Sequence, residues 1–168
     1  VSESIIVGGS TEVLIDKISF TSEYEGMYVE KLTFTATNAD SFDGVTIEYP
    51  DETGAVVSQS ADFVEATSSV TFSGMTMYVP KDETVTLTIK ADIKSVADPA
   101  VTSGNVIDVD WDYDGDIKVV SASGTVDEDA TDNSGLITDT SGTVSGFSSN
   151  ITSTDHYVYA TKPTLARN

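Results

Sequence analysis

Hydrophobic and polar residues alternate with a period of two along most of this 168-residue chain. Such alternation places apolar side chains on one face of an extended strand and polar side chains on the other. The most regular run, 84–93, alternates Thr, Lys and Asp with five apolar residues: Val85, Leu87, Ile89, Ala91 and Ile93. The pattern therefore predicts a half-buried strand there.

Similar runs predict further strands, separated by Pro-, Gly- and Asp-containing turns. A change of apolar phase between Ile15 and Ile18 also predicts a bulge. Residues 59–67 fit a strand as well as a helix, and no other stretch has a helical period. The remaining predicted strands lie at 13–20, 29–36, 45–49, 70–72, 75–79, 105–120 and 156–165.

Seven to nine short strands, each followed by a turn, favour an all-β fold, an antiparallel β-sandwich of immunoglobulin-like type. We expect residues 1–12 to form an N-terminal extension or an exchanged strand. Residues 13–168 then form a single sandwich domain, with a polar Ser/Thr/Asp-rich insertion around 121–154. Scattered apolar residues in that insertion favour an irregular hairpin over disorder.

Composition excludes several classes of protein. The chain has 28 acidic and 8 basic residues, a formal charge of −20, no cysteine and one histidine. Without cysteine there is no disulfide, thiolate metal site or thiol nucleophile. The negative charge argues against nucleic acid or an anionic membrane surface as a partner. No apolar run approaches the roughly 18–20 residues of a membrane span, so we expect no membrane insertion.

Three segments have a recognisable arrangement of strands and turns. The segment 77–93 (MYVPKDETVTLTIKADI) reads as a short strand, a Pro-led turn and a Thr-rich strand that ends in Ala-Asp-Ile. It resembles immunoglobulin-like β-sandwich repeats of prokaryotic surface proteins, and the opening 8–14 (GGSTEVL) and the closing 158–165 (VYATKPTL) resemble the ends of such repeats. This resemblance implies an extracellular or cell-surface component of an S-layer, sheath, filament or adhesin, and it brings no catalytic residue with it.

The segment 108–116 (DVDWDYDGD) is the strongest chemical feature. Alternate strand residues lie about 6.6–6.8 Å apart on one face, so carboxylates at every second position form a row. Neighbouring charges at ~7 Å repel by roughly 2 kcal/mol at an effective dielectric near 20. A hard cation such as Ca²⁺ offsets this repulsion. The predicted metal ligands are Asp108, Asp110, Asp112, Asp114 and Asp116.

The acidic row has other interpretations: an EF-hand, which the sequence argues against, and a loop site or a solvated strand, which stay open. Asp110, Asp112, Asp114 and Gly115 match the first half of an EF-hand loop, but its twelfth position is Ser121 where a Glu is expected. A loop site completed from the polar insertion, by Asp127, Glu128, Asp129, Asp132 or Asp139, fits better. The row could also be a solvated acidic strand that prevents edge-to-edge pairing.

The remaining chemical groups predict little reactivity. His156 lies beside Asp155, but no nucleophile elbow or oxyanion loop accompanies it, so we interpret it as a surface or strand-end residue rather than part of a triad. Asn150 heads the N-glycosylation sequon Asn-Ile-Thr. An isopeptide bond from Lys31 or Lys90 is a minor alternative. We therefore expect no enzyme activity.

The sequence thus favours a structural subunit or repeat of a surface assembly, joined to copies of itself or neighbouring repeats by strand addition. Residues 1–7 are the expected exchanged strand, with Gly8 and Gly9 as its hinge, and Ca²⁺ would neutralise the acidic surface. The alternative is an adhesin or carbohydrate-binding module. In it the aromatic residues that would stack on a glycan are Trp111, Tyr113, Tyr157 and Tyr159.

Overall fold

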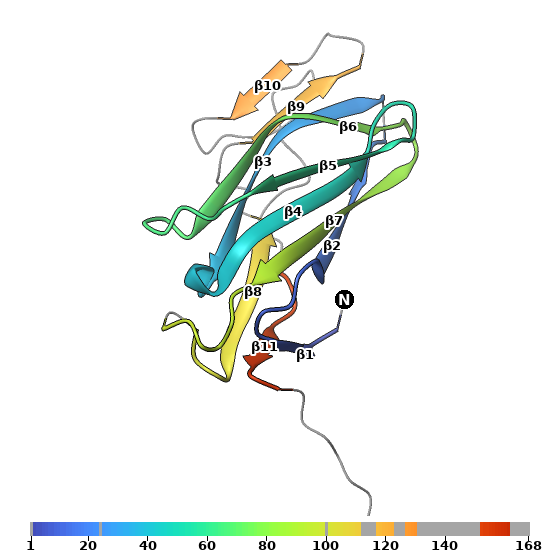
Figure 1. The fold of residues 1–168 in the computed structure, drawn as a ribbon. Coiled ribbons are helices and arrows are strands. Elements are labelled where there is room, and N and C mark those ends of the chain that lie inside the picture. The colour runs from blue at the N-terminus through green and yellow to red at the C-terminus, as the bar shows by residue number, and fades with distance from the viewer. Residues whose placement is uncertain are drawn as a thin grey trace, which may run out of the picture.

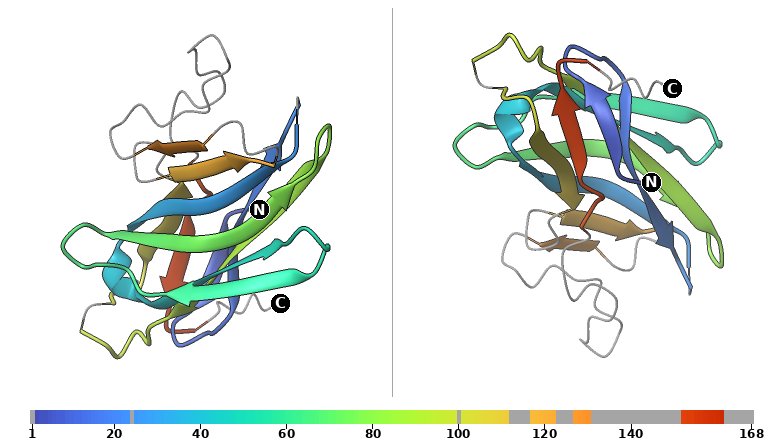
Figure 2. Two further views of the ribbon diagram at one scale, coloured as in Figure 1. Left: turned by 90° about the horizontal axis from the view of Figure 1, so that it is seen from above. Right: turned by 90° about the horizontal axis from the view of Figure 1, so that it is seen from below.

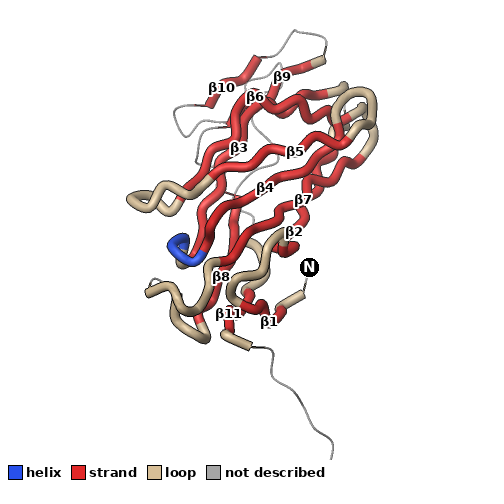
Figure 3. The backbone as a smooth tube through the Cα atoms, viewed as in Figure 1, coloured by secondary structure: helices blue, strands red, loops and turns tan. Residues whose placement is uncertain are grey.

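In a computed structural model, the chain forms two β-sheets that stack face to face (Figure 1). The structure describes residues 2–23, 25–99, 101–111, 117–122, 127–130 and 152–161. Within them the one helical element is the short 3-10 turn η1, Ala39–Ser41, and all other regular structure is β-strand (Figure 3). None of the described segments forms a helix of the length and apolar character needed to cross a membrane.

The smaller sheet has four antiparallel strands in the order β2-β7-β4-β5. Its central strand β7 buries every second residue, from Val85 to Ile93, as the alternation predicts. The predicted bulge in β2 is present, although it lies at the register shift between Leu14 and Asp16. The strands are β2 (Val13–Thr21), β4 (Phe42–Pro50), β5 (Val56–Ala61) and β7 (Thr84–Ile93).

The larger sheet has seven strands arranged around β3. β6 pairs along most of β3, so β8 and β9 share its other side, with β9 beside Met27–Lys31 and β8 beside Phe34–Thr37. β11 and β1 continue the sheet beyond β8, and β10 continues it beyond β9. The strands are β1 (Ser4–Val7), β3 (Met27–Thr37), β6 (Ser69–Val79), β8 (Asn105–Trp111), β9 (Ile117–Ser121), β10 (Asp127–Ala130) and β11 (His156–Tyr159).

The core lies between the two sheets and is built from the inward side chains of both. Trp111 of β8 is completely buried and packs on Phe20 of β2, with ring centroids 5.7 Å apart, so it joins one sheet to the other. Phe34 and Phe72 pack edge to face between β3 and β6 at 6.1 Å. Burial of such aromatic side chains is a major source of stability in a sandwich.

The predicted fold class, an all-β antiparallel sandwich, is confirmed. The described residues contain eleven strands rather than seven to nine, because short strands such as β1 and β10 extend the larger sheet. Residues 105–120 form two strands along one side of β3 instead of one, and 70–79 form one strand instead of two. Strand β5 covers only the first part of the ambiguous segment 59–67.

Candidate functional site

The acidic row is described only at its start. Asp108 and Asp110 lie on β8 and are half-buried, on the face opposite the buried residues Ile107, Val109 and Trp111. This arrangement is the alternation that the sequence predicts. The other three predicted ligands, Asp112, Asp114 and Asp116, lie outside the described residues.

Both described carboxylates accept backbone hydrogen bonds from neighbouring segments. The Asp108 carboxylate accepts the amide proton of Thr37 at 2.9 Å, and the Asp110 carboxylate accepts that of Ser153 at 2.7 Å. The Ser153 hydroxyl in turn accepts the amide proton of Val109 at 3.0 Å. These bonds attach the segment before β11 to β8 beside the acidic row.

Burial is the main cause that raises the pKa of the Asp110 carboxyl above its ordinary value, and the negative charges of Asp108 and Asp155 raise it further. The hydrogen bonds from Ser153 act in the opposite direction and do not cancel these effects. The ionised form of Asp110 is therefore disfavoured in the folded protein. A cation bound near these three carboxylates would relieve that cost.

The described part of the chain does not by itself assemble a metal site. Within it, no three acidic or histidine side chains converge closely enough to hold an ion. Asp108, Asp110 and Asp155 form an acidic patch in which the charges of Asp108 and Asp155 act on Asp110, so calcium binding stays a prediction.

A second feature is the position of β1, which falls within the predicted N-terminal extension. It lies at an edge of the larger sheet and pairs in parallel with β11, in a register that places Ser4 beside His156 and Ile6 beside Val158. Figure 2 shows β1 and β11 side by side in the view from below. Ile6 is buried in the core, whereas Ile5 on the other face is exposed. The strand is thus held by one apolar side chain and by its backbone pairing.

His156 connects this strand to the opposite sheet. Its ring is completely buried. Nε2 lies 2.9 Å from the carbonyl oxygen of Ile15, and Nδ1 lies 2.9 Å from the Ser4 hydroxyl. Because a carbonyl only accepts, Nε2 carries the proton and Nδ1 accepts from Ser4. His156 lies at a strand end, as predicted, but it is not a surface residue.

The bulge explains why Ile15 needs this partner. The β2–β7 register skips Ile15 between Leu14 and Asp16, and the extra residue of a bulge is left without a ladder partner. A buried carbonyl without a partner costs about 1–3 kcal/mol. One imidazole therefore satisfies the bulge of one sheet and orders the edge strand of the other.

The expected glycine hinge is held in place rather than left free. The Gly8 amide donates to Tyr159, and the Gly9 amide donates to Ile93, each at 2.9 Å. A Cβ at Gly8 would approach the Val96 side chain to 2.7 Å, and Gly9 has a positive φ of 85°. Glycine is required at both positions by close packing and by backbone conformation.

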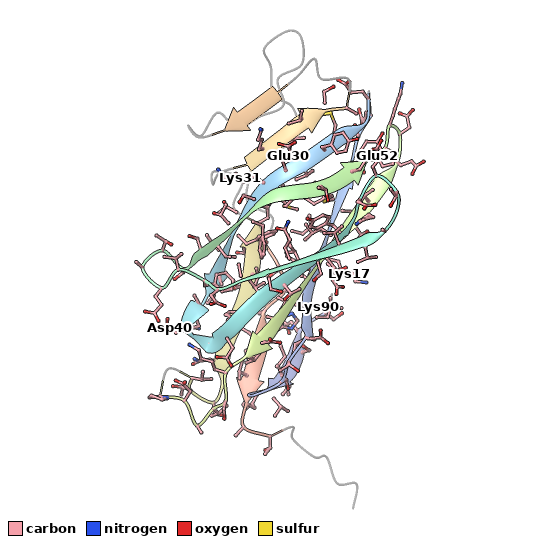
Figure 4. The ribbon with its side chains drawn as sticks, turned by 45° about the horizontal axis from the view of Figure 1, so that its top comes forward. Lys17, Glu30, Lys31, Asp40, Glu52 and Lys90 are labelled. Atoms are coloured by element: carbon pink, nitrogen blue, oxygen red, sulfur yellow. The ribbon has the colours of Figure 1, made fainter. Side chains whose placement is uncertain are left out.

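The other predicted groups have a structural role or lie outside the described residues, apart from two tyrosines on β11. Trp111 belongs to the core, and Tyr113 lies outside the described residues. Of the four aromatic residues in the glycan-stacking hypothesis, Tyr157 and Tyr159 lie on the described strand β11. Lys90, one of the two lysines considered for an isopeptide bond, forms an ion pair with Glu48 at 2.7 Å, so its amine lies beside a carboxylate. Lys90 is labelled in Figure 4. The Asn150 sequon and residues 131–151 lie outside the described residues.

A hollow of about 290 Å³ lies beside η1. Its floor contains Phe42 and Phe63, whose ring centroids are 5.1 Å apart. The charged residues around it are Asp40, Asp43, Asp62, Glu65 and Lys94. All four carboxylates there are exposed side chains.

Comparison with known proteins gives no relative: no family model, curated protein or solved structure matches this chain.

The raised pKa of Asp110 predicts a pH-dependent effect of Asp110→Asn. The substitution removes a charge whose ionisation is disfavoured in the fold, so it should raise the midpoint of thermal unfolding at pH 7. The gain should disappear as the pH falls below the ordinary carboxyl pKa, where Asp110 is protonated in both states. Asp43→Asn removes an exposed carboxylate of β4 and is the control for the loss of one negative charge. Equal effects of both variants at pH 7 would contradict this account.

Substitution of the buried imidazole tests the inter-sheet bridge. His156→Phe keeps a ring in the core but removes both hydrogen bonds, so it should lower the free energy of unfolding in urea by about 1–3 kcal/mol. Tyr157→Phe, on the opposite face of the same strand, is the matched control and should cost less. A His156→Phe protein as stable as wild type would show that the bridge contributes nothing.

Proposed function

We propose that this protein is a non-enzymatic structural subunit, or a repeat, of an extracellular surface assembly such as a layer, sheath or filament. Copies join when β1 of one molecule adds to the larger sheet of another. The all-β fold, the acidic composition and the resemblance of segments 8–14, 77–93 and 158–165 to surface-protein repeats support this function.

The observation that carries the proposal is how β1 is held. All its strand pairing is with β11, and its side-chain hydrogen bond from Ser4 reaches His156, 152 positions away in the sequence. These contacts do not depend on the direct connection between β1 and β2. The same strand from a neighbouring copy would make identical contacts with β11, which is how donated strands bind to sheet edges.

The charge of −20 opposes this association. Like-charged subunits repel over distances comparable to the Debye length, about 8–10 Å near physiological salt. Cations at the acidic patch of Asp108, Asp110 and Asp155 would reduce the repulsion between copies. Calcium is the cation that best suits an irregular set of carboxylate oxygens.

The alternative, an adhesin or carbohydrate-binding module, retains less support. Its aromatic platform loses Trp111 to the core. Tyr159 is 36% exposed and Tyr157 is half-buried on the outer face of β11, so these are the two rings of the platform that the described residues offer to a glycan. Binding of a monomeric sample to a glycan array would favour this function over assembly.

Deletion of residues 2–7 tests strand addition. The shortened chain should remain folded, because β1 contributes one buried side chain, Ile6, to the core between the sheets. By electron microscopy it should not form the large particles that we expect of the full chain. A synthetic peptide of residues 2–10 should bind the shortened chain, because it restores the pairing with β11.

Two point variants provide matched controls for the deletion. Ile6→Ala removes the buried side chain of β1 and should weaken assembly, whereas Ile5→Ala removes its exposed neighbour and should leave assembly close to wild type. Unchanged assembly of the shortened chain would refute strand addition by β1.

Calcium should stabilise the fold if the acidic row binds it. Millimolar Ca²⁺ should raise the midpoint of thermal unfolding above the value in NaCl of equal ionic strength, because a ligand that binds only the folded state stabilises it. Asp110→Asn should reduce this increment, and Asp43→Asn should not. No difference between CaCl₂ and NaCl would exclude the site.

A further inference from the structure

The sheets of this molecule have several edges, and most of them carry a feature that prevents pairing. β2 contains a bulge and the charged residues Asp16 and Lys17. In β6, Gly74, Met75 and Thr76 face the single residue Glu30 of β3, a wide interruption of its pairing. β10 has the sequence Asp-Glu-Asp-Ala. Bulges and charges are common protections of exposed edges.

β5 lacks both protections. It is the last strand of the smaller sheet, and among the described strands it pairs with β4 alone, in a continuous register from Val45–Ala61 to Pro50–Val56 with no shift. Its sequence, VVSQSA, has no charged residue and no proline, in a chain of net charge −20. Val56 at its start is 72% exposed. An edge of this kind is a template for another strand.

The backbone of β5 has the capacity to pair again. In an antiparallel edge strand every second residue directs its N–H and C=O away from its only neighbour. A contact from β5 to β6 is made by a side chain: the Gln59 amide donates to the Gly74 carbonyl at the long distance of 3.5 Å. The strand thus presents a row of donors and acceptors beside uncharged side chains.

We infer that the edge of β5 binds β5 of a second copy in antiparallel orientation, so that two four-stranded sheets become one continuous sheet of eight. The identity of the partner rests on the proposed function. The charge pattern favours this occupant, because β5 is itself an uncharged edge strand with an uninterrupted register. It is longer than β1, the other described edge strand that is both uncharged and uninterrupted. A two-fold axis perpendicular to the sheet relates the copies.

The uncharged stretch selects a register for this pair. A two-fold axis through Ser58 places Ser58 opposite its own copy, Val57 opposite Gln59, and Val56 opposite Ser60, with no charge in any pair. In this register each residue lies opposite a residue whose side chain is on the same face of the combined sheet, as in any antiparallel pair. Centred one residue later, the axis would place Val56 opposite Asp62.

The net charge of −20 on each copy opposes this pairing. Salt screens exposed charges, so the β5 pair should tighten as salt concentration rises. Combined with strand addition at β1, on a different sheet, two separate contacts on each molecule would allow an extended assembly rather than a closed dimer.

A single introduced cysteine tests the register directly, because the native chain has none. In the full-length protein under mild oxidation, Ser58→Cys should form a disulfide-linked dimer, since directly opposite Cα atoms lie about 4.5–5.5 Å apart, within the range that a disulfide spans. Ser19→Cys, at an exposed position of edge strand β2, should stay mostly monomeric. Equal cross-linking of both variants, or none for Ser58→Cys, would overturn the inference.

A matched pair of charge variants tests the β5 contact without a covalent cross-link. Ser60 on β5 and Ser19 on β2 are both exposed and both lie opposite a threonine, Thr46 and Thr86 respectively. In sedimentation velocity at high salt, Ser60→Glu should raise the dimer dissociation constant about tenfold or more, and Ser19→Glu should not. Thermal unfolding of both variants verifies that they are folded.

Deletion of residues 2–7 separates this inference from the proposed function. If the shortened chain still dimerises and Ser60→Glu abolishes that dimer, the β5 contact is supported. If the shortened chain also still forms large particles, strand addition by β1 is refuted. Wild-type protein that stays monomeric at high salt and high concentration would overturn the β5 contact, whatever β1 does.

Discussion

The unpaired backbone at the edges of two open sheets is the constraint on which the rest of this structure depends. A sandwich buries its side chains between the layers, but it leaves N–H and C=O groups at the outer strands without partners. In the described residues these edges are treated in different ways. β2 is bulged and bridged by His156, β10 is acidic, and β1 and β5 are uncharged and regular. The chemistry of the molecule therefore lies at its edges and not in a reactive cavity.

The inter-sheet core makes this possible. Trp111 and Phe20 join β8 to β2, and the buried alternation of β7 fixes the register of the smaller sheet. The core takes one buried side chain from β1, Ile6, and the half-buried Val57 and Ala61 from β5. β1 could therefore be exchanged, and β5 could gain a second neighbour, while most of the central packing stays in place. His156 is the exception, since the same ring holds Ser4 and the bulged carbonyl of Ile15. Release of β1 would leave one of its nitrogens without a partner, which is a cost that a strand from another copy would remove.

Local periodicity predicted much of this fold because it reports which residues are buried. The alternation at 84–93 and the side-chain pattern around Asp108, Asp110 and Trp111 are confirmed. Strand β5 was harder to recognise, since its adjacent valines and small polar residues show no clear alternation. In β11 the buried residues His156 and Val158 alternate with two tyrosines. The alternation in the sequence therefore places His156 on the same face as Val158, the face that is buried. The pairing of β1 with β11 has no local signature, as its partners lie at opposite ends of the sequence.

Hydrogen exchange of the assembled protein against the dilute monomer is the most direct test of edge-mediated association. We predict that assembly slows exchange at the amides of 4–7 and 56–61, the strands β1 and β5, and leaves the amides of β2 and β10 almost unchanged. Protection that appears mainly at β2 or β10, or at no strand edge, would contradict the account.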